Sequence, residues 1–201
     1  VLLKESTRSI KARVNMYALG STALRAGLLS DDDSTVKPPK VRSFIKHRNT
    51  EKEFAGSRGF GFIRPMTQAQ VPDYMALNMN DPEYPKTVVS LADQTDHSGE
   101  VYLIEAIEPV TKNKAALGLD IASEPNRKLA ATSSAATGTA TLTAPLNLTQ
   151  VNDPNTVGFL LLTPVYKDGV PLNSPEERSK HLIGWTYSAF LIEELLATAQ
   201  L

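Results

Sequence analysis

The residues that could perform acid–base or metal chemistry are few in this sequence and scattered along it. The histidines His47, His97 and His181 fall in segments predicted to be polar, and no two lie at the spacing of metal ligands. Glu105 and Glu108 lie in one predicted strand, where their separation puts them on opposite faces, so we expect no joint action on one bond. No nucleophile elbow and no paired-histidine zinc motif occurs. The sequence therefore predicts no catalytic residue, no metal ligand and no cofactor.

Two other motifs have the composition of ion-binding loops but not the required spacing. Residues 30–34 hold three adjacent aspartates, yet they lack the alternating ligands and central glycine of a calcium-binding loop. Residues 56–61 (GSRGFG) are rich in glycine, but no Gly-Lys-Ser/Thr helix start follows them. We interpret the first motif as a solvated turn and the second as the approach to a strand over residues 59–65.

A different group of residues favours ligand binding. A sheet with one concave face, lined by aromatic rings and a few polar groups, can form a small-molecule pocket without a nucleophile. Trp185 and Tyr187 share one face of the last predicted strand. Because Trp185 is the only tryptophan, it suits a core position as well as a pocket wall, and its indole N–H needs a partner in both. The predicted pocket residues, all near the middle of strands, are Tyr102, Thr143, Leu162, Trp185 and Tyr187.

The segment that organises these strands is residues 115–145. It begins with a short apolar strand, continues as a helix whose first amides Ser123 would cap, and stops at Gly138. A threonine-rich strand over residues 139–148 follows. Further strands are predicted at residues 59–65, 87–91, 100–108, 158–166 and 182–190, with the second and third of these forming a long hairpin. Since turns join most of the strands, the fold class is α+β, an antiparallel sheet flanked by helices.

Residues 1–30 have the pattern of a long helix. Leu3, Ile10, Tyr17 and Leu24 recur every seven residues, but the companion positions are only partly apolar. Such a broken heptad fits a helix lying on its own domain and equally a contact between subunits. A second, shorter helix begins at the proline pair of residues 38–39.

Composition excludes several classes of function. The chain has 201 residues, of which 41% are hydrophobic, and a net charge of -1, so it has no basic field that would attract nucleic acid or an anionic membrane. Cysteine is absent, which excludes disulfides and thiolate chemistry. No apolar run approaches the ~18 residues that a membrane helix needs. The chain begins at Val1 without a signal peptide, and we expect it to be a piece excised from a longer protein.

Several segments occur in an order and spacing that resemble a known family. They are ALGLDIASEPNR, LTAP, GFLLLTPVY (Gly158–Tyr166), Glu177-Arg178 and Gly184-Trp185. Together they resemble the CHASE domain, the extracytoplasmic ligand-sensing module of transmembrane histidine kinases, diguanylate cyclases and plant cytokinin receptors. The resemblance covers residues 59–190, and its specificity comes from the ordered set, since each segment alone is weak.

The resemblance implies a PAS-like sheet preceded by a long N-terminal helix. We expect a dimerisation stalk of two helices over residues 1–55, a PAS-like sensor core over residues 56–190, and the start of a helix toward a missing membrane-proximal lobe over residues 191–201. It further implies a homodimer formed through the N-terminal helix, and a periplasmic or other extracytoplasmic portion of an inner-membrane protein. Membrane contact would be made only by flanking helices absent from this chain, and the output domain would be a cytoplasmic histidine kinase or diguanylate cyclase.

The resemblance also draws attention to Arg127. In the plant cytokinin receptors an aspartate of the helix hydrogen-bonds the adenine, and matching LTAP and the helix without gaps places Arg127 at that position. An arginine only donates hydrogen bonds and favours a carboxylate or phosphate. We therefore hypothesise a ligand other than a cytokinin-type adenine, and an acidic one if Arg127 faces the pocket. The alternative is that Arg127 points to solvent or pairs with Glu124.

The leading interpretation is a small-molecule sensor module that is not itself an enzyme. A hydrolase or transferase of α+β type is a second possibility, which requires a nucleophile and base brought together by the fold. A third is a ligand-free dimerisation or protein-binding module, in which side chains would fill the pocket.

Overall fold

The computed structural model describes residues 2–29, 38–81, 84–91, 99–151, 153 and 155–198. These residues contain one seven-stranded sheet with the order β2-β4-β3-β1-β7-β6-β5. Its long central strands are β3 (Glu100–Glu108), β1 (Ser57–Thr67), β7 (Leu182–Leu191) and β6 (Gly158–Tyr166), and each is antiparallel to its neighbours. The edge strands are β2 (Val89–Ser90), β4 (Leu119–Asp120) and β5 (Thr141–Leu142). The predicted α+β class, with a mainly antiparallel sheet flanked by helices, is confirmed.

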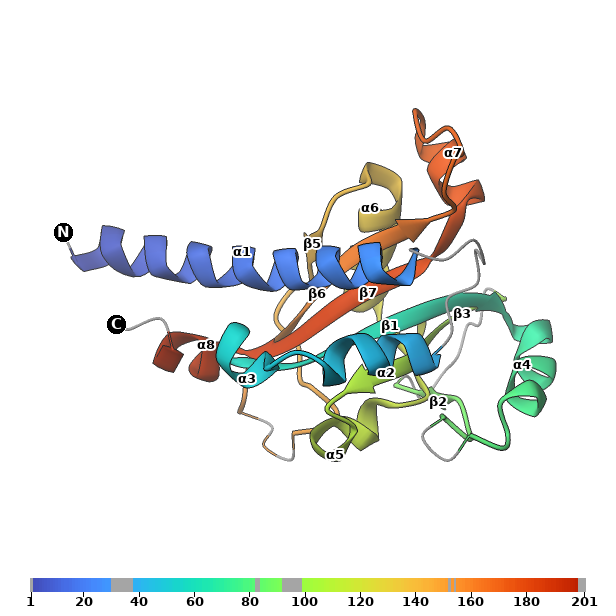
Figure 1. The fold of residues 1–201 in the computed structure, drawn as a ribbon, viewed down its shortest axis with the longest axis horizontal. Coiled ribbons are helices and arrows are strands. Elements are labelled where there is room, and N and C mark those ends of the chain that lie inside the picture. The colour runs from blue at the N-terminus through green and yellow to red at the C-terminus, as the bar shows by residue number, and fades with distance from the viewer. Residues whose placement is uncertain are drawn as a thin grey trace.

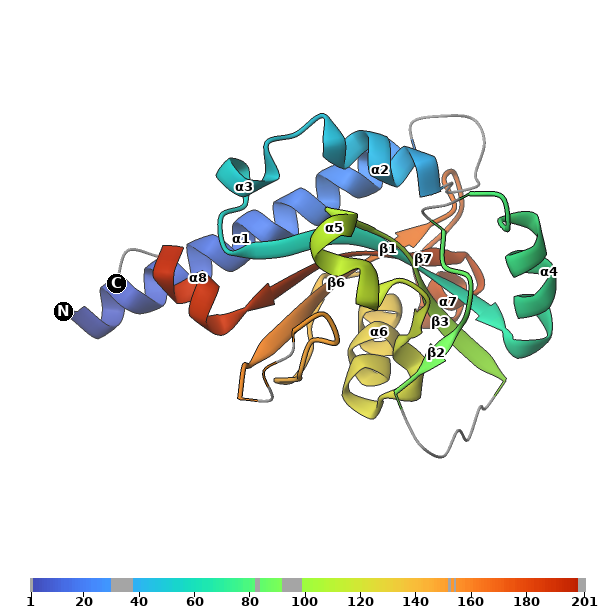
Figure 2. The same cartoon turned by 90° about the horizontal axis from the view of Figure 1, so that it is seen from below.

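The helices lie on both faces of this sheet (Figure 2). α1 and α2 cover one face, and α6 covers the other. Phe60 and Phe62 of β1 belong to the apolar cluster under α1, whereas Ile63 belongs to the cluster under α6, as the alternation of that strand predicts. The helices are α1 (Leu2–Leu28), α2 (Pro38–Lys46), α3 (Thr50–Glu53), α4 (Val71–Leu77), α5 (Val110–Asn113), α6 (Pro125–Thr137), α7 (Pro175–Lys180) and α8 (Ile192–Thr198), with 3-10 turns at Gln68–Gln70, Lys114–Ala116 and Ile121–Ser123.

α1 packs on the sheet through its second half. Tyr17, Leu24 and Leu28 are fully buried, Ile10 and Val14 are only partly buried, and the first turns extend past the sheet beside α8 (Figure 1). The predicted N-terminal helix is confirmed, and its heptad positions from Ile10 onward pack against the chain's own core. The side chain of Leu3 lies outside the described residues, as do the aspartates of residues 31–33 and His97.

α6 starts and stops through local hydrogen bonds. The Glu124 carboxylate accepts from the backbone N–H groups of Asn126 and Arg127, and Gly138 ends the helix in a left-handed conformation with φ of 75°. The prediction that Ser123 caps α6 is wrong, because a 3-10 turn delays the helix start. The Ser123 hydroxyl instead donates to the Asp120 carbonyl at 2.5 Å and accepts from the Leu91 N–H at 2.8 Å.

Two strand predictions need correction. The predicted strand over residues 139–148 is interrupted: Thr141–Leu142 forms β5 and Leu146 makes an isolated bridge to Gly158, while Pro145 between them lacks the N–H that a ladder requires. The predicted hairpin between residues 87–91 and 100–108 does not form: β2 pairs in parallel with β4, which lies between β2 and β3. Strand β4 comes later in the chain, so local turn signals could not reveal the insertion.

A bulge in β3 alters which face its residues occupy. The register pairs Phe62 with Ala106 and Ile63 with Ile104, leaving Glu105 as the extra residue. Glu108 pairs with Phe60, and the extra residue brings Glu105 onto the same face as Glu108. The prediction that the two carboxylates lie on opposite faces is therefore wrong. The two carboxylates nevertheless have different partners: Glu105 binds the Arg64 guanidinium, and Glu108 accepts from the Val110 N–H.

Candidate ligand-binding cleft

A cleft of about 590 Å³ opens on the α6 face of the sheet. Its walls are the ends of β1 and β3, the second half of α6, and α7 with the start of β7; we call it the α6–α7 cleft. The volume lies within the range of small-molecule sites. Two of the residues predicted for the pocket, Tyr102 and Trp185, are among those that line it.

Tyr102 and Trp185 form the floor of the cleft. Their ring centroids are 4.8 Å apart in a tilted arrangement, and both side chains are buried. The Trp185 indole N–H donates to the Ala131 carbonyl of α6 at 3.0 Å, which supplies the partner that the sequence analysis required. The Tyr102 hydroxyl donates to the Glu100 carboxylate at 3.0 Å, and burial, aided by that negative charge, raises the pKa of Tyr102. Tyr102 therefore stays a neutral donor.

The α7 wall is held against α6 by Arg178. Its Nε donates to the Ala136 carbonyl at 2.6 Å and its Nη1 donates to the Leu172 carbonyl at 2.7 Å. A capping box between Ser174 and Glu177 fixes the start of α7. The Glu177-Arg178 pair thus builds one wall of the cleft, a role that the sequence analysis did not assign. A short polar helix end followed by an arginine is too common a pattern to reveal such a contact.

The other predicted residues of the sheet lie deeper on the same face. Leu162 and Tyr187 belong to the same buried cluster as Tyr102 and Trp185, but neither lines the cleft. Gly61 lies opposite Tyr187, and a Cβ there would meet the Tyr187 ring at 2.6 Å, so the glycine lets that ring lie across β1. Thr143 is buried near the β5 edge, where its hydroxyl accepts from the Leu160 N–H at 3.0 Å.

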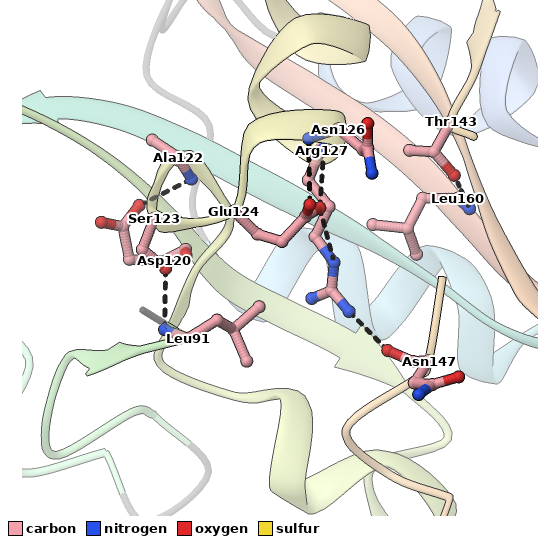
Figure 3. A network of polar contacts seen from close by, with 10 residues as sticks. All are labelled: Leu91, Asp120, Ala122, Ser123, Glu124, Asn126, Arg127, Thr143, Asn147 and Leu160. Carbon is pink, nitrogen blue, oxygen red and sulfur yellow. Dashed lines mark hydrogen bonds and ion pairs between the residues drawn. The ribbon is translucent and has the colours of Figure 1, made fainter. Parts of the chain in front are cut away.

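Arg127 is buried at the first turn of α6 and is not exposed to the cleft (Figure 3). Its Nη2 donates to the Asn147 carbonyl at 2.7 Å, and its Nε lies 3.9 Å from the Glu124 carboxylate. Burial lowers the pKa of Arg127, although Glu124 opposes that shift. Of the two arrangements left open by the sequence, solvent exposure is excluded, and the pairing with Glu124 is present.

Asp120 fixes the turn that precedes α6, a role that was not predicted from the sequence. One oxygen of its buried carboxylate accepts from the Ala122 N–H at 2.9 Å (Figure 3). The same oxygen accepts from the Tyr102 N–H at 2.9 Å. It therefore joins β3, which carries part of the cleft floor, to the turn before α6. Alternation alone could not identify this role, because the second residue of a two-residue strand gives no periodic signal.

The described residues outside the cleft offer no metal site either. No group of three or more histidine, aspartate or glutamate residues within the described part of the chain is placed to hold a metal. Of the histidines, His47 and His181 fall within this part, and neither lines the cleft. The cleft therefore presents apolar rings, hydroxyls, an amide and two charged side chains, which suit binding through packing and hydrogen bonds.

A family model described as CHASE domain matches residues 34–201. The chain belongs to the CHASE domain family. The match extends beyond both ends of the segment where the resemblance was seen and begins after α1. Among curated proteins no match is found.

CHASE domains are extracellular sensor domains of signalling receptors, not catalytic domains. Across the ranges that the structure describes, no helix combines the length and apolarity needed to cross a membrane. The family assignment agrees with a site built from packing surfaces and hydrogen-bonding groups.

Proposed function

We propose that this CHASE domain binds a small molecule in the α6–α7 cleft and signals its presence by shifting the sheet against α1 and α8. The observation that carries the proposal is the path of β7. This strand begins at the cleft with Leu182, contributes Trp185 to the floor, and continues without a break into α8. A displacement of the cleft floor is thereby passed along one strand to the end of the domain where α1 and α8 meet (Figure 1).

The contacts between α1 and α8 support a joint movement of the two helices. Arg13 of α1 donates from Nη2 to the Thr198 carbonyl of α8 at 2.7 Å. The Tyr17 hydroxyl donates to the Ala55 carbonyl at 2.8 Å, and the Thr198 hydroxyl, which has shorter contacts to carbonyls of its own helix, lies 3.3 Å from the same carbonyl. Burial raises the pKa of Tyr17 to about 12, so this hydroxyl remains a donor at neutral pH. A shift of either helix alone would break the bond between Arg13 and Thr198, which a shift of both preserves.

The interface between α1 and the sheet has a polar seam made by Ser21, Thr163 and Thr186. The Thr186 hydroxyl donates to the Ser21 carbonyl at 2.9 Å, and a longer contact of 3.4 Å joins it to the Thr163 carbonyl. The Ser21 and Thr163 hydroxyls are buried and have no hydrogen-bond partner within the described chain. Because these hydroxyls could pair after a small displacement, the seam supports two arrangements of α1 on the sheet.

We further propose that two copies of the domain pair through α1. The exposed side chains of this helix between residues 12 and 26 are uncharged, and Leu19 and Met16 are 63% and 41% exposed. Exposed apolar side chains on a projecting helix suit a partner helix of the same kind. Leu19→Asp should make the chain monomeric in sedimentation experiments, whereas Met79→Asp, at the 67% exposed Met79 after α4, should not. Equal effects of the two variants would contradict pairing through α1.

The position in the cell and the downstream partner follow from the same proposal. A sensor of this family would lie in the periplasm or another extracytoplasmic space and would be joined to a membrane by other parts of its receptor. Its output would be a cytoplasmic histidine kinase or diguanylate cyclase. The acidic-ligand hypothesis stays a prediction: Arg127 lies outside the cleft, so a contact between Arg127 and a ligand requires α6 to move at its first turn.

Calorimetry with variants that fill the cleft tests the proposal. Isopentenyladenine and a panel of small carboxylates are titrated into the chain, and into Thr132→Trp, whose new ring would occupy the cleft from α6. Leu129→Trp is the matched control, because Leu129 is exposed on the same helix but does not line the cleft. We expect a carboxylate to bind the chain and the control and to lose at least tenfold in affinity for Thr132→Trp. Binding that Thr132→Trp leaves intact would reject the cleft as the site.

The relay is tested by hydrogen exchange with the same ligand. Its addition should change the exchange of amides in α1 and α8, which lie away from the cleft, and Thr186→Val should weaken that change. Protection confined to α6 and α7 would show binding without a relay through the sheet.

A further inference from the structure

One negative and one positive side chain line different walls of the α6–α7 cleft. Glu100 comes from the first residue of β3, and Lys180 is the last residue of α7. Both side chains are exposed, and they are the charged residues among those lining the cleft. Lys180 makes neither a hydrogen bond nor an ion pair with any other residue that the structure describes, so its ammonium is available to a ligand.

The Glu100 carboxylate is oriented toward the cleft. Strand alternation puts Glu100 on the same face as Tyr102, and the Tyr102 hydroxyl donates to its Oε2 at 3.0 Å. The second oxygen has no partner among the described residues and remains an acceptor. An ionised carboxylate accepts hydrogen bonds but donates none, so the group it favours is a cation.

The floor between these two charges is apolar. Tyr102, Trp185 and Ala135 present rings and a methyl group, and Thr132 and Ser179 add hydroxyls at the rim. Packing on such a floor supplies affinity but distinguishes poorly between molecules of similar shape. The two charges provide the selectivity, because Glu100 repels a purely anionic ligand and Lys180 repels a purely cationic one.

We propose that the cleft recognises a small zwitterion, with its ammonium on Glu100, its carboxylate on Lys180 and its apolar body on the Tyr102–Trp185 floor. This inference rests on the proposed function, since it names the ligand class of the same cleft. It also gives the acidic group of the ligand a partner that is open to solvent, which the buried Arg127 is not.

The experiment uses α-amino acids as probes. Each of the twenty standard α-amino acids is screened by its effect on thermal unfolding of the chain, and the tightest binder is then measured by calorimetry. Its amide lacks the carboxylate, and its N-acetyl derivative lacks the ammonium. We expect the parent amino acid to bind at least tenfold tighter than either derivative.

Variants of the two charged residues assign each end of the ligand. Lys180→Gln should remove the preference for the parent over its amide and leave the preference over the N-acetyl derivative. Glu100→Gln should remove the preference for the parent over the N-acetyl derivative and leave the preference over the amide. Thr132→Trp should abolish binding of all three molecules, and Leu129→Trp should bind them like the unmodified chain.

The outcomes separate this inference from the proposed function. If a carboxylate without an ammonium binds in the cleft as tightly as any amino acid, the zwitterion is rejected and the ligand-binding cleft stands. The zwitterion is likewise rejected, and the ligand-binding cleft stands, if Lys180→Gln and Glu100→Gln leave all affinities unchanged. If no amino acid, carboxylate or adenine binds at millimolar concentration, both the zwitterion and the cleft are rejected.

Discussion

The two faces of the sheet hold their helices by different kinds of contact. On the α6 face, side chains of the sheet donate to carbonyls of the helix: Trp185 to Ala131 at 3.0 Å and Tyr166 to Ala135 at 2.6 Å. On the α1 face, the Thr186 hydroxyl donates to the Ser21 carbonyl and Arg25 of α1 donates from Nη1 to the Pro164 carbonyl at 3.3 Å, while the Ser21 and Thr163 hydroxyls have no partner among the described residues. The α6 face is therefore fixed by several bonds to one helix, and the α1 face by apolar packing together with these two bonds.

This difference suits a sensor. A binding cleft needs walls that keep their positions when the ligand is absent, since ordering them on binding would reduce affinity. An output helix instead needs two arrangements of similar free energy, because a ligand can shift only an equilibrium that already exists. The α6 face meets the first requirement, and in the proposed function the hydroxyl seam under α1 would meet the second.

The largest effect is expected from the ion pair on the α1 and α2 face. Arg64 binds the buried Glu105 carboxylate through Nε at 2.7 Å and Nη2 at 3.2 Å. Arg64→Met removes that partner and leaves a buried charge, which typically costs about 3 to 5 kcal/mol. Urea unfolding should show this loss. Arg58→Met, whose partner Glu194 has a side chain that is 41% exposed, should lose less than about 1 kcal/mol.

The pH dependence identifies Glu105 as the cause. Burial raises the pKa of Glu105 above its usual 4.5, and Arg64 opposes that shift, so Arg64→Met should raise it further. The folded variant then holds a proton that the unfolded chain releases, and its stability should fall as pH rises from 4.5 through the raised pKa. Below pH 4.5 Glu105 is protonated in the folded and the unfolded variant, so the loss of stability caused by Arg64→Met should disappear. A loss independent of pH would assign the effect of Arg64→Met to packing alone.

The second effect compares glycines on the two faces. An Ala side chain at Gly61, on the α6 face, would lie 2.1 Å from the Ala106 carbonyl, which belongs to the backbone and cannot rotate away. Gly61→Ala should lower the free energy of unfolding by about 1 to 3 kcal/mol. Gly20→Ala, in α1, would have the ring edges of Phe54 and Phe60 as its nearest neighbours, at 2.8 Å, and gains helix propensity of up to about 1 kcal/mol.

The measurement for these glycine variants is the midpoint of urea unfolding at constant slope. Gly20→Ala should change the unfolding midpoint little, because the neighbouring rings can move and the gain in helix propensity offsets the crowding. If Gly20→Ala costs as much as Gly61→Ala, the α1 face is as tightly constrained as the α6 face, and the comparison fails.

Most of the fold could be predicted from the sequence, because its long elements carry strong patterns. The apolar run of Gly158–Tyr166 and the alternation around Phe60 identified β6 and β1, and the proline pair at residues 38–39 located α2. The errors were at edges and irregular positions. The parallel β2–β4 pair and the bulge at Glu105 depend on contacts between distant segments, which periodicity in one segment cannot encode.

The candidate site could be predicted only in part. Tyr102 and Trp185 were identified because aromatic residues at the middle of strands are typical of pocket walls. Tyr187 satisfies the same pattern and Leu162 is likewise in the middle of a strand, but neither lines the cleft. The rim could not be predicted, since Lys180 belongs to a short helix that is tied to α6 by Arg178, a contact between distant segments.

The third effect concerns the seam under α1. Thr186→Val keeps the shape of the side chain but removes the hydroxyl that donates to the Ser21 carbonyl, and should lower stability by about 1 kcal/mol. The amides in the second half of α1 should exchange faster, because this bond joins α1 to the sheet. Thr186→Ser retains the hydroxyl and should retain slow exchange. Faster exchange in Thr186→Ser would attribute the effect to the lost methyl group.

The smallest effect has the opposite sign and comes from Tyr187. Its side chain is fully buried, its hydroxyl has no hydrogen-bond partner in the described chain, and burial raises its pKa although the Arg127 charge opposes the shift. Removing an unpaired buried hydroxyl relieves its desolvation, so Tyr187→Phe should leave stability unchanged or raise it by up to about 1 kcal/mol. Urea unfolding of the chain without added ligand measures the change.

Tyr166→Phe is the matched control on the same face. It removes the 2.6 Å bond to the Ala135 carbonyl of α6, so it should lower stability by about 1 kcal/mol. If Tyr187→Phe instead lowers stability as much as Tyr166→Phe, the Tyr187 hydroxyl has a partner in solution, such as a water or an anion beside Arg127. The polar interior beside α6 would then be a second place for a ligand, and the contrast between a fixed α6 face and an adjustable α1 face would lose its sharpest support.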